Sequence, residues 1–394
     1  RRASMQAKAA YIHIPFCKKI CHYCAFNKFF YDGQPVGDYL AALDQEMAAY
    51  ELDQTQPLDT LYIGGGTPSC LSLSELDYLL ASIHRRLPLT DKTEFSFEIN
   101  PGELSLEKCR LLKDQGVNRI SMGVQTFNDR LLRKIGRNHR EKQIYQSIDW
   151  FRQVGFENLS IDLIFRLPEQ TLADFDESLT KALSLDLPHY SLYSLIIENQ
   201  TVFQQLMRQG KLPLPSEDVD ADMFQLAIDR LKDAGIHQYE VSNFAKPGYE
   251  SQHNLGYWRY TPYYGFGAGA HGFLDGTRYY NHGPVHHYLK QLRAGNKPII
   301  DASPLDLVDQ MEEFLFLALR TTQGVCLTDF QTRFGYRAEA LFADFFRQQA
   351  ERGLLIEESD RIYLTTRGLF LADLVFRDLI GWLKERPQIM NKED

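Results

Sequence analysis

Buried strands alternate with amphipathic helices through the first half of the chain, and this alternation sets the tightest limit on its fold. Runs typical of strands occupy residues 9–14, 59–63, 94–99, 119–124, 159–164 and 190–195. Apolar residues at helical spacing fill the intervals, at 37–52, 72–87, 105–115, from 145 towards Gly155, and at 172–185. Six such repeats predict an α/β fold whose parallel strands are joined by right-handed crossovers. A helix at 218–234 and a strand at 238–241 are expected to continue the sheet.

The residues best suited to chemistry lie where these strands end. The carboxyl ends of parallel strands meet at one edge of a sheet, where α/β folds bind their ligands. Three cysteines follow the first strand, and the run Gly64-Gly65-Gly66 follows the second. Polar residues mark the next three strands: Glu98, Gln125 and Asp162. The pattern predicts a single site at this edge.

The spacing C-x3-C-x2-C relates Cys17, Cys21 and Cys24. Three thiolates this close can hold three corners of a [4Fe–4S] cluster and leave the fourth iron open for chemistry. A structural zinc site needs four ligands, for which His22 is the nearby candidate. Three buried structural thiols are the remaining alternative. The scattered cysteines are expected to be core or incidental thiols: Cys70, Cys109 and Cys326.

The cysteine spacing and the preceding Tyr11-Ile12-His13-Ile14-Pro15-Phe16 resemble the radical S-adenosylmethionine (SAM) superfamily. Within it, the chain is similar to the oxygen-independent coproporphyrinogen III oxidase-like family, which includes the HemW group. The resemblance implies a partial (β/α)6 radical SAM barrel, a [4Fe–4S] cluster, and SAM chelated to the open iron. It also implies the residues that bind SAM: Tyr11, Tyr23, Gly65, Gly66, Thr67, Glu98, Gln125, Arg137 and Asp162.

Physical chemistry supports part of this set. Glycines lack a Cβ and let a backbone approach a ligand closely, and a plain tight turn seldom needs three of them. Glu98 at a strand end can accept hydrogen bonds from a ribose or an amine. Arg137 lies in the basic segment 130–140, which could meet carboxylates of SAM or of a porphyrin. A solvated helix face is the alternative for Arg130 and Arg133.

A second signature, His253-Asn254-Leu255-Gly256-Tyr257-Trp258, resembles the H-N-x-x-Y-W stretch of the HemW group. An imidazole can ligate haem iron while aromatic rings pack on the macrocycle. The glycine-rich stretch 265–272 is also similar to that group and contains a second histidine. The haem candidates are therefore His253, Tyr257, Trp258 and His271. For either histidine, the alternative is a residue satisfied by ordinary hydrogen bonds.

The character of the chain changes after residues 298–305, which resemble a domain boundary. We expect a radical SAM domain over 5–297 and a C-terminal domain over 306–386. Arg1-Arg2-Ala3-Ser4, ahead of Met5, resembles a cloning remnant and is excluded from the fold.

The C-terminal domain is expected to be winged-helix-like. Its predicted elements are helices at 311–319, 327–334 and 339–354, then a strand at 361–365. Such a domain can bind DNA, but acidic residues outnumber basic ones over 339–360. A protein-contact or lid role is therefore favoured.

The overall composition excludes several partners. The net charge of −9 gives no general attraction for nucleic acid or for an anionic membrane. No apolar run is long enough to span a bilayer, and there is no secretory signal. Six cysteines in so long a chain do not form a disulfide framework. We expect a cytoplasmic protein that does not bind nucleic acid.

Two departures from coproporphyrinogen III oxidase point to the HemW group. That enzyme continues its motif as C-x3-C-x2-C-x-C, whereas Phe26 takes the last place here, and only sixteen residues precede Cys17. The resemblance implies a chaperone that binds haem and transfers it to acceptor proteins, as a monomer or a dimer. It leaves open whether acceptors are membrane-associated and whether the chain has enzymatic turnover. The alternative function is oxidative decarboxylation of coproporphyrinogen III by radical SAM chemistry.

Overall fold

Six parallel strands form the centre of the molecule. The computed structural model describes residues 5–390, so the expected remnant at 1–4 lies outside it. The strands are β1 (Ala9–Ile14), β4 (Thr60–Gly65), β5 (Glu94–Ile99), β6 (Arg119–Gln125), β7 (Leu159–Phe165) and β8 (His189–Ser194). They pair side by side in this order, and every pair is parallel. The predicted α/β fold with six repeats is confirmed.

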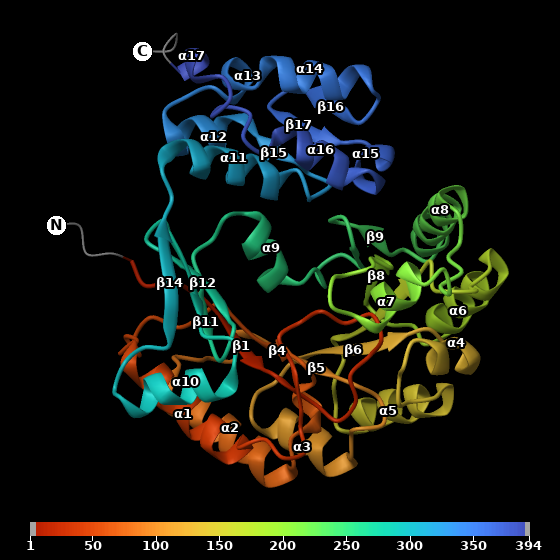
Figure 1. The fold of residues 1–394 in the computed structure, drawn as a ribbon, viewed down its shortest axis with the longest axis vertical. Coiled ribbons are helices and arrows are strands. Elements are labelled where there is room, and N and C mark those ends of the chain that lie inside the picture. The colour runs from red at the N-terminus through yellow and green to blue at the C-terminus, as the bar shows by residue number, and fades with distance from the viewer. Residues whose placement is uncertain (1–4, 391–394) are drawn as a thin grey trace.

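Helices cover the outer side of these strands (Figure 1). They are α1 (Val36–Ala49), α2 (Leu73–Arg86), α3 (Leu106–Asp114), α4 (Asp129–Lys134), α5 (Glu141–Gln153) and α6 (Leu172–Ser184). Side-chain caps fix several starts: Ser72 and Glu75, for example, form a reciprocal capping box. Apolar residues of strands and helices share one large core.

Short strands extend the sheet on both sides without closing it. β11 (Tyr264–Phe266) pairs parallel to β1, while β10 (Asn243–Ala245) pairs antiparallel to β8 and to β9 (His237–Gln238). β11 and β9 are the two edges of the nine-stranded sheet, which is therefore an open, partial barrel. The strand expected over 238–241 is instead two short strands, because the chain turns where the Tyr239 amide donates to Asn243 O, at 3.0 Å.

The cluster loop and the segments after β8 complete the barrel domain. β2 (Phe16–Cys17) and β3 (Phe29–Phe30) bracket the loop. Later elements are α7 (Val202–Arg208), α8 (Glu217–Asp233), α9 (Gln252–Trp258), β12 (His271–Leu274), β13 (Thr277–Asn281), α10 (Val285–Arg293) and β14 (Ile299–Pro304). β14 occupies the expected boundary and pairs with β13, so this segment is a strand rather than an unstructured linker.

The C-terminal part forms a separate layer with its own core, at the top of Figure 1. Its helices are α11 (Leu307–Ala318), α12 (Leu327–Phe334), α13 (Ala338–Leu341), α14 (Ala343–Glu351), α15 (Thr366–Phe370), α16 (Ala372–Leu379) and α17 (Pro387–Met390). β15 (Val325–Cys326), β17 (Arg361–Leu364) and β16 (Leu355–Glu358) pair in that order. The helix expected over 339–354 is divided at Phe342, which leaves the helical conformation. The helices α11 to α14, of which α13 and α14 take the place of the expected third helix, are followed by a ribbon and match the winged-helix-like expectation.

None of the helices between residues 5 and 390 combines the length and apolar character that crossing a bilayer requires.

Candidate functional site

The three motif cysteines lie on one loop at the carboxyl end of β1. Pairing of Phe16 with Phe29 closes the loop at its base, and Cys24 turns back on Cys21 through a backbone hydrogen bond of 3.3 Å. Cys17 is buried, whereas Cys21 and Cys24 are half-buried. The pKa of Cys17 is raised to about 11, chiefly by burial and to a smaller extent by the neighbouring Cys24 and Cys21. Holding these sulfurs as thiolates requires compensating positive charge, which an iron cluster supplies.

The arrangement differs from a site for a single ion. Among residues 5–390, no group of three His, Cys, Asp or Glu side chains converges on one metal position. A [4Fe–4S] cluster binds each thiolate to a different iron, so its ligands stand further apart than those of one zinc ion. His22, the candidate fourth ligand of the zinc alternative, has its Nδ1 3.1 Å from Lys134 O, and its ring packs against Phe203.

The glycine run at the end of β4 packs directly against the cluster loop and the strand before it. Gly65 has a φ of +127°, and a Cβ at this position would lie 2.6 Å from Ile14 O. A Cβ on Gly66 would lie 2.8 Å from Cys17 Sγ. The next residue, Thr67, donates from Oγ1 to the same sulfur at 3.4 Å. Any side chain at either glycine would therefore displace the loop that carries Cys17.

A buried arginine connects the loop to the neighbouring strands. Arg137 Nη1 donates to Cys21 Sγ at 3.5 Å, and Nη2 donates to Asn100 Oδ1 at 2.9 Å. Asn100 Nδ2 in turn donates to Thr67 Oγ1 at 3.1 Å, which completes a path between two of the cysteines. Gln125 lies beside it, at a bulge between β6 and β7, with a φ of +68°. Sequence reasoning did not single out Asn100.

Arg130 and Lys134 of the same basic segment lie at the surface instead. Lys134 pairs with Glu169 at 2.8 Å, and Arg130 reaches Glu169 and Asp174 at 3.4 and 3.6 Å, all at the surface. The solvated-face alternative therefore describes Arg130, whereas Arg137 is turned inward.

Two carboxylates face each other inside the barrel. Burial raises the pKa of Glu98 to about 7 and that of Asp162 to about 6. Glu98 accepts hydrogen bonds from Tyr62 Oη at 2.8 Å and from the Gly65 amide at 3.3 Å. Arg119, the first residue of β6, is only 2% exposed, and its charge lowers the pKa of both carboxylates. Sequence reasoning missed Arg119, because nothing marks it locally as an inward-facing residue.

Tyr11 joins the site through a chain of hydrogen bonds. Its hydroxyl lies 2.9 Å from His13 Nδ1, and His13 Nε2 lies 2.8 Å from Asn27 O. Asn27 Nδ2 donates to Ala268 O at 3.2 Å, so the glycine-rich stretch contacts the cluster loop. Tyr23 is close to Arg137 and the motif sulfurs, and burial raises its pKa.

A buried glutamate anchors the glycine-rich stretch to α1. Glu46 is 0% exposed and accepts hydrogen bonds from the Gly267 amide, Tyr288 Oη and Asn281 Nδ2, at 2.7 to 2.8 Å. The sequence did not indicate this residue, since its partners are more than 200 positions away. His271, beyond the anchored stretch, is exposed and stacks on Tyr280 with ring centroids 5.5 Å apart.

The H-N-x-x-Y-W segment lies at the opposite end of the barrel. It forms α9, whose first amides, from Gln252 and His253, donate to Glu94 at the start of β5 at 2.9 and 3.1 Å. His253 Nδ1 lies 2.8 Å from Thr60 Oγ1, and Nε2 lies 2.6 Å from Tyr257 Oη. Burial lowers the pKa of His253 to about 3. Both ring nitrogens are thus engaged in holding α9 against the barrel.

Trp258 points from the same helix towards the C-terminal domain. The Arg320 guanidinium lies 4.8 Å from the centre of its ring and also contacts Phe316 and Phe376. Figure 1 shows α9 between the barrel and this domain. The structure therefore does not bring the cysteines and the H-N-x-x-Y-W segment together.

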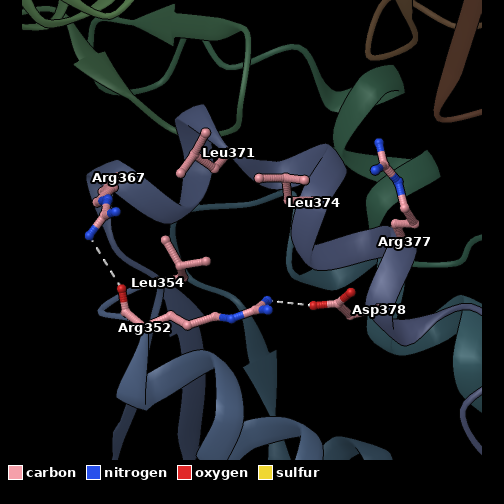
Figure 2. Close-up of a pocket in the computed structure, with 7 residues that line it drawn as sticks. All are labelled: Arg352, Leu354, Arg367, Leu371, Leu374, Arg377 and Asp378. Atoms are coloured by element: carbon pink, nitrogen blue, oxygen red, sulfur yellow. Dashed lines mark hydrogen bonds and ion pairs between the residues drawn. The ribbon is translucent and has the colours of Figure 1, made fainter.

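The C-terminal domain contains a hollow of about 310 Å³, shown in Figure 2. Three leucines and three arginines line it, and Arg352 is neutralised by Asp378 at 2.7 Å. It presents no titratable group other than these charges.

Comparison with known proteins supports the same two parts of the chain, a barrel and a C-terminal domain. A Radical SAM superfamily model matches residues 11–182, and a HemN C-terminal domain model matches residues 305–371. The heme chaperone HemW of Bacillus subtilis is 48% identical over 95% of this chain and 100% of its own length. The chain belongs to the HemW family. HemW proteins of Lactococcus lactis and Escherichia coli are 46% and 35% identical, over 94% and 93% of this chain and 97% and 96% of their own lengths.

A solved structure shows the same fold. Coproporphyrinogen III oxidase (HemN) from Escherichia coli superposes with a TM-score of 0.81, at 24% identity, covering 95% of this chain and 90% of its own. The fold expected for the HemW family, a radical SAM barrel followed by a C-terminal helical domain, is thus confirmed.

Proposed function

We propose that this chain binds haem and transfers it to acceptor proteins, on a scaffold that also holds a [4Fe–4S] cluster and SAM. The full-length similarity to proteins named heme chaperone HemW carries the proposal. Phe26, which stands where the coproporphyrinogen III oxidase motif has a fourth cysteine, supports it. A cytoplasmic location and acceptors of unknown identity belong to the same proposal.

In this proposal, Cys17, Cys21 and Cys24 bind the cluster. Once bound, the cluster would leave one iron open to SAM and would supply the electron for SAM cleavage. Gly65 and Gly66 provide the close backbone approach, and Thr67 fixes Cys17 by its hydrogen bond.

The remaining SAM residues approach from the barrel wall. Ionised Glu98 and Asp162 are acceptors for amine or ribose groups, and Arg137 is close enough to Cys21 to balance thiolate charge. Tyr11, Tyr23 and Gln125 border the same space. These assignments follow the family resemblance and the proximity of the side chains.

A paired assay tests the function. The purified wild-type protein is titrated with haem while the Soret absorbance is followed, and the same preparation, with reduced cluster and SAM, is assayed for decarboxylation of coproporphyrinogen III. The proposal expects saturable haem binding and no decarboxylation. Efficient decarboxylation without haem binding would instead assign the chain to coproporphyrinogen III oxidation.

A further inference from the structure

A cleft of about 690 Å³ separates α9 from the C-terminal domain. α9 forms one wall, and α11, α12 and the turn before β15 form the other (Figure 1). This volume lies within the range of about 300–1,000 Å³ that small-molecule sites occupy. None of the candidate cluster or SAM residues lines this cleft.

The cleft carries an apolar and aromatic patch within a lining that is otherwise mostly polar. Leu255 and Ala318 are buried on facing helices, and Trp258 and Phe314 expose part of their rings to the same space. Within α9, His253 and Tyr257 face the barrel while Leu255 and Trp258 face the cleft. The H-N-x-x-Y-W segment therefore contributes one face to the barrel and the other to the cleft.

Guanidinium groups surround the cleft. Arg259, Arg333 and Arg361 line it, and none of them forms a salt bridge within residues 5–390. The Arg333 guanidinium lies over the rings of Tyr260 and Phe314, at 4.8 and 5.6 Å. The acidic residues that line the cleft are Glu250 and Asp329. Three arginines against two carboxylates, beside the patch of Leu255, Trp258, Phe314 and Ala318, favour a ligand that combines a flat apolar surface with carboxylates.

A thiol also borders the cleft. Cys326 is half-buried there, whereas Cys70 and Cys109 are buried in the barrel core. Its Sγ donates to Asp360 Oδ2 at 3.2 Å. Sulfur is an established axial ligand of haem iron. If Cys326 were to ligate ferric haem iron, its thiol would lose its proton, and Asp360, which already accepts the hydrogen bond from that thiol, would be positioned to take it.

We propose that this cleft is the haem site of the chain, with the macrocycle against Trp258 and Phe314, the propionates at Arg333 and Arg361, and the iron facing Cys326. The inference rests on the proposed haem-binding function and adds where haem lies and what holds it. His253 is then a positioning residue: it holds α9 in place and does not touch the iron.

Haem titration of full-length variants tests the location. In Arg333→Glu/Arg361→Glu, the loss of the propionate partners should weaken haem affinity by about tenfold or more. Arg367→Glu/Arg377→Glu, in the hollow of Figure 2, makes the same change of charge in the same domain and should titrate like the wild type. Equal haem affinity in the first variant and the wild type would overturn the cleft assignment.

The Soret band tests the iron ligand separately. Cys326→Ser should shift the band maximum, because the axial sulfur is lost while the cleft walls remain. An unchanged band in Cys326→Ser, together with a shifted band in His271→Ala, would overturn the ligand assignment. A wild type that binds no haem would reject the proposed function itself, a result distinct from a wild type that binds haem outside the cleft.

Discussion

Glu98 gives the candidate SAM site a pH response of its own. Its pKa is raised to about 7 by burial, so the carboxylate is partly protonated near neutrality. The protonated form is a poorer partner for the SAM amine, so SAM affinity should fall as the pH is lowered from about 8 to about 6, approaching tenfold per pH unit below the pKa. Equilibrium binding measured across this range checks the prediction. Glu98→Gln should flatten the profile, and a variant that keeps the wild-type pH dependence would contradict it.

The motif cysteines should hold all of the cluster iron. After anaerobic reconstitution the wild type should contain about four irons per chain, and Cys17→Ala, Cys21→Ala or Cys24→Ala should lose the cluster absorbance. Cys109→Ala, which removes a buried thiol of the α3 helix, is the matched control and should keep the iron. A full cluster in Cys21→Ala would refute the ligand assignment.

Gly66 should be sensitive to the smallest side chain. A Cβ there would meet Cys17 Sγ at 2.8 Å, so Gly66→Ala should lower cluster occupancy. Gly37→Ala is the control, because the space around Gly37 is open for at least 4 Å. Iron and sulfide analysis of both variants measures the effect. Equal iron content would show that the loop adjusts to the added methyl group.

At the residue scale, the sequence alone can indicate residues whose type and spacing suggest their role. Cysteine spacing and consecutive glycines are enough by themselves to indicate a cluster loop, because few other roles need them. Asn100, Arg119 and Glu46 could not be predicted as site residues. Their importance comes from partners on distant segments, such as Gly267 for Glu46, and a single sequence does not report such contacts.

At the element scale, the position of α9 in the fold is what the sequence indicated least. His253 was a haem candidate, with a residue satisfied by ordinary hydrogen bonds as the alternative, and the structure has both nitrogens of that ring hydrogen-bonded at the amino end of the barrel. The six strands, by contrast, were predicted within one or two residues, because their period-two and buried patterns are local. Which end of a barrel a later helix covers depends on long-range packing.

Removing the His253 ring should loosen α9. His253→Ala leaves Thr60 and Tyr257 without their partner, which should cost roughly 1–3 kcal/mol of stability. Haem affinity should fall with it, while the Soret maximum of the residual complex stays in place. His287→Ala, at an exposed position on α10, is the control. Thermal unfolding and haem titration measure both effects, and a shifted Soret maximum would contradict the positioning role.

At the scale of the whole molecule, two hydrophobic cores meet through a small set of contacts. Arg320 is central to them: its guanidinium packs on Trp258, and its carbonyl accepts from the Val241 amide at 2.9 Å. Arg320→Ala should weaken this junction and separate thermal unfolding into two transitions. Arg347→Ala, an exposed residue paired only with Asp344, should unfold like the wild type. A single unchanged transition in Arg320→Ala would contradict the role of this contact.

The proposed cluster and haem sites lie at opposite ends of the barrel. β4 has 6 residues between them, and such a strand spans about 20 Å, so the two sites should not share ligands. Haem titration of cluster-free Cys21→Ala beside the reconstituted wild type tests this most directly. Both proteins should bind about one haem per chain with the same Soret maximum. Loss of haem binding in the cluster-free variant, with its fold intact, would contradict the account.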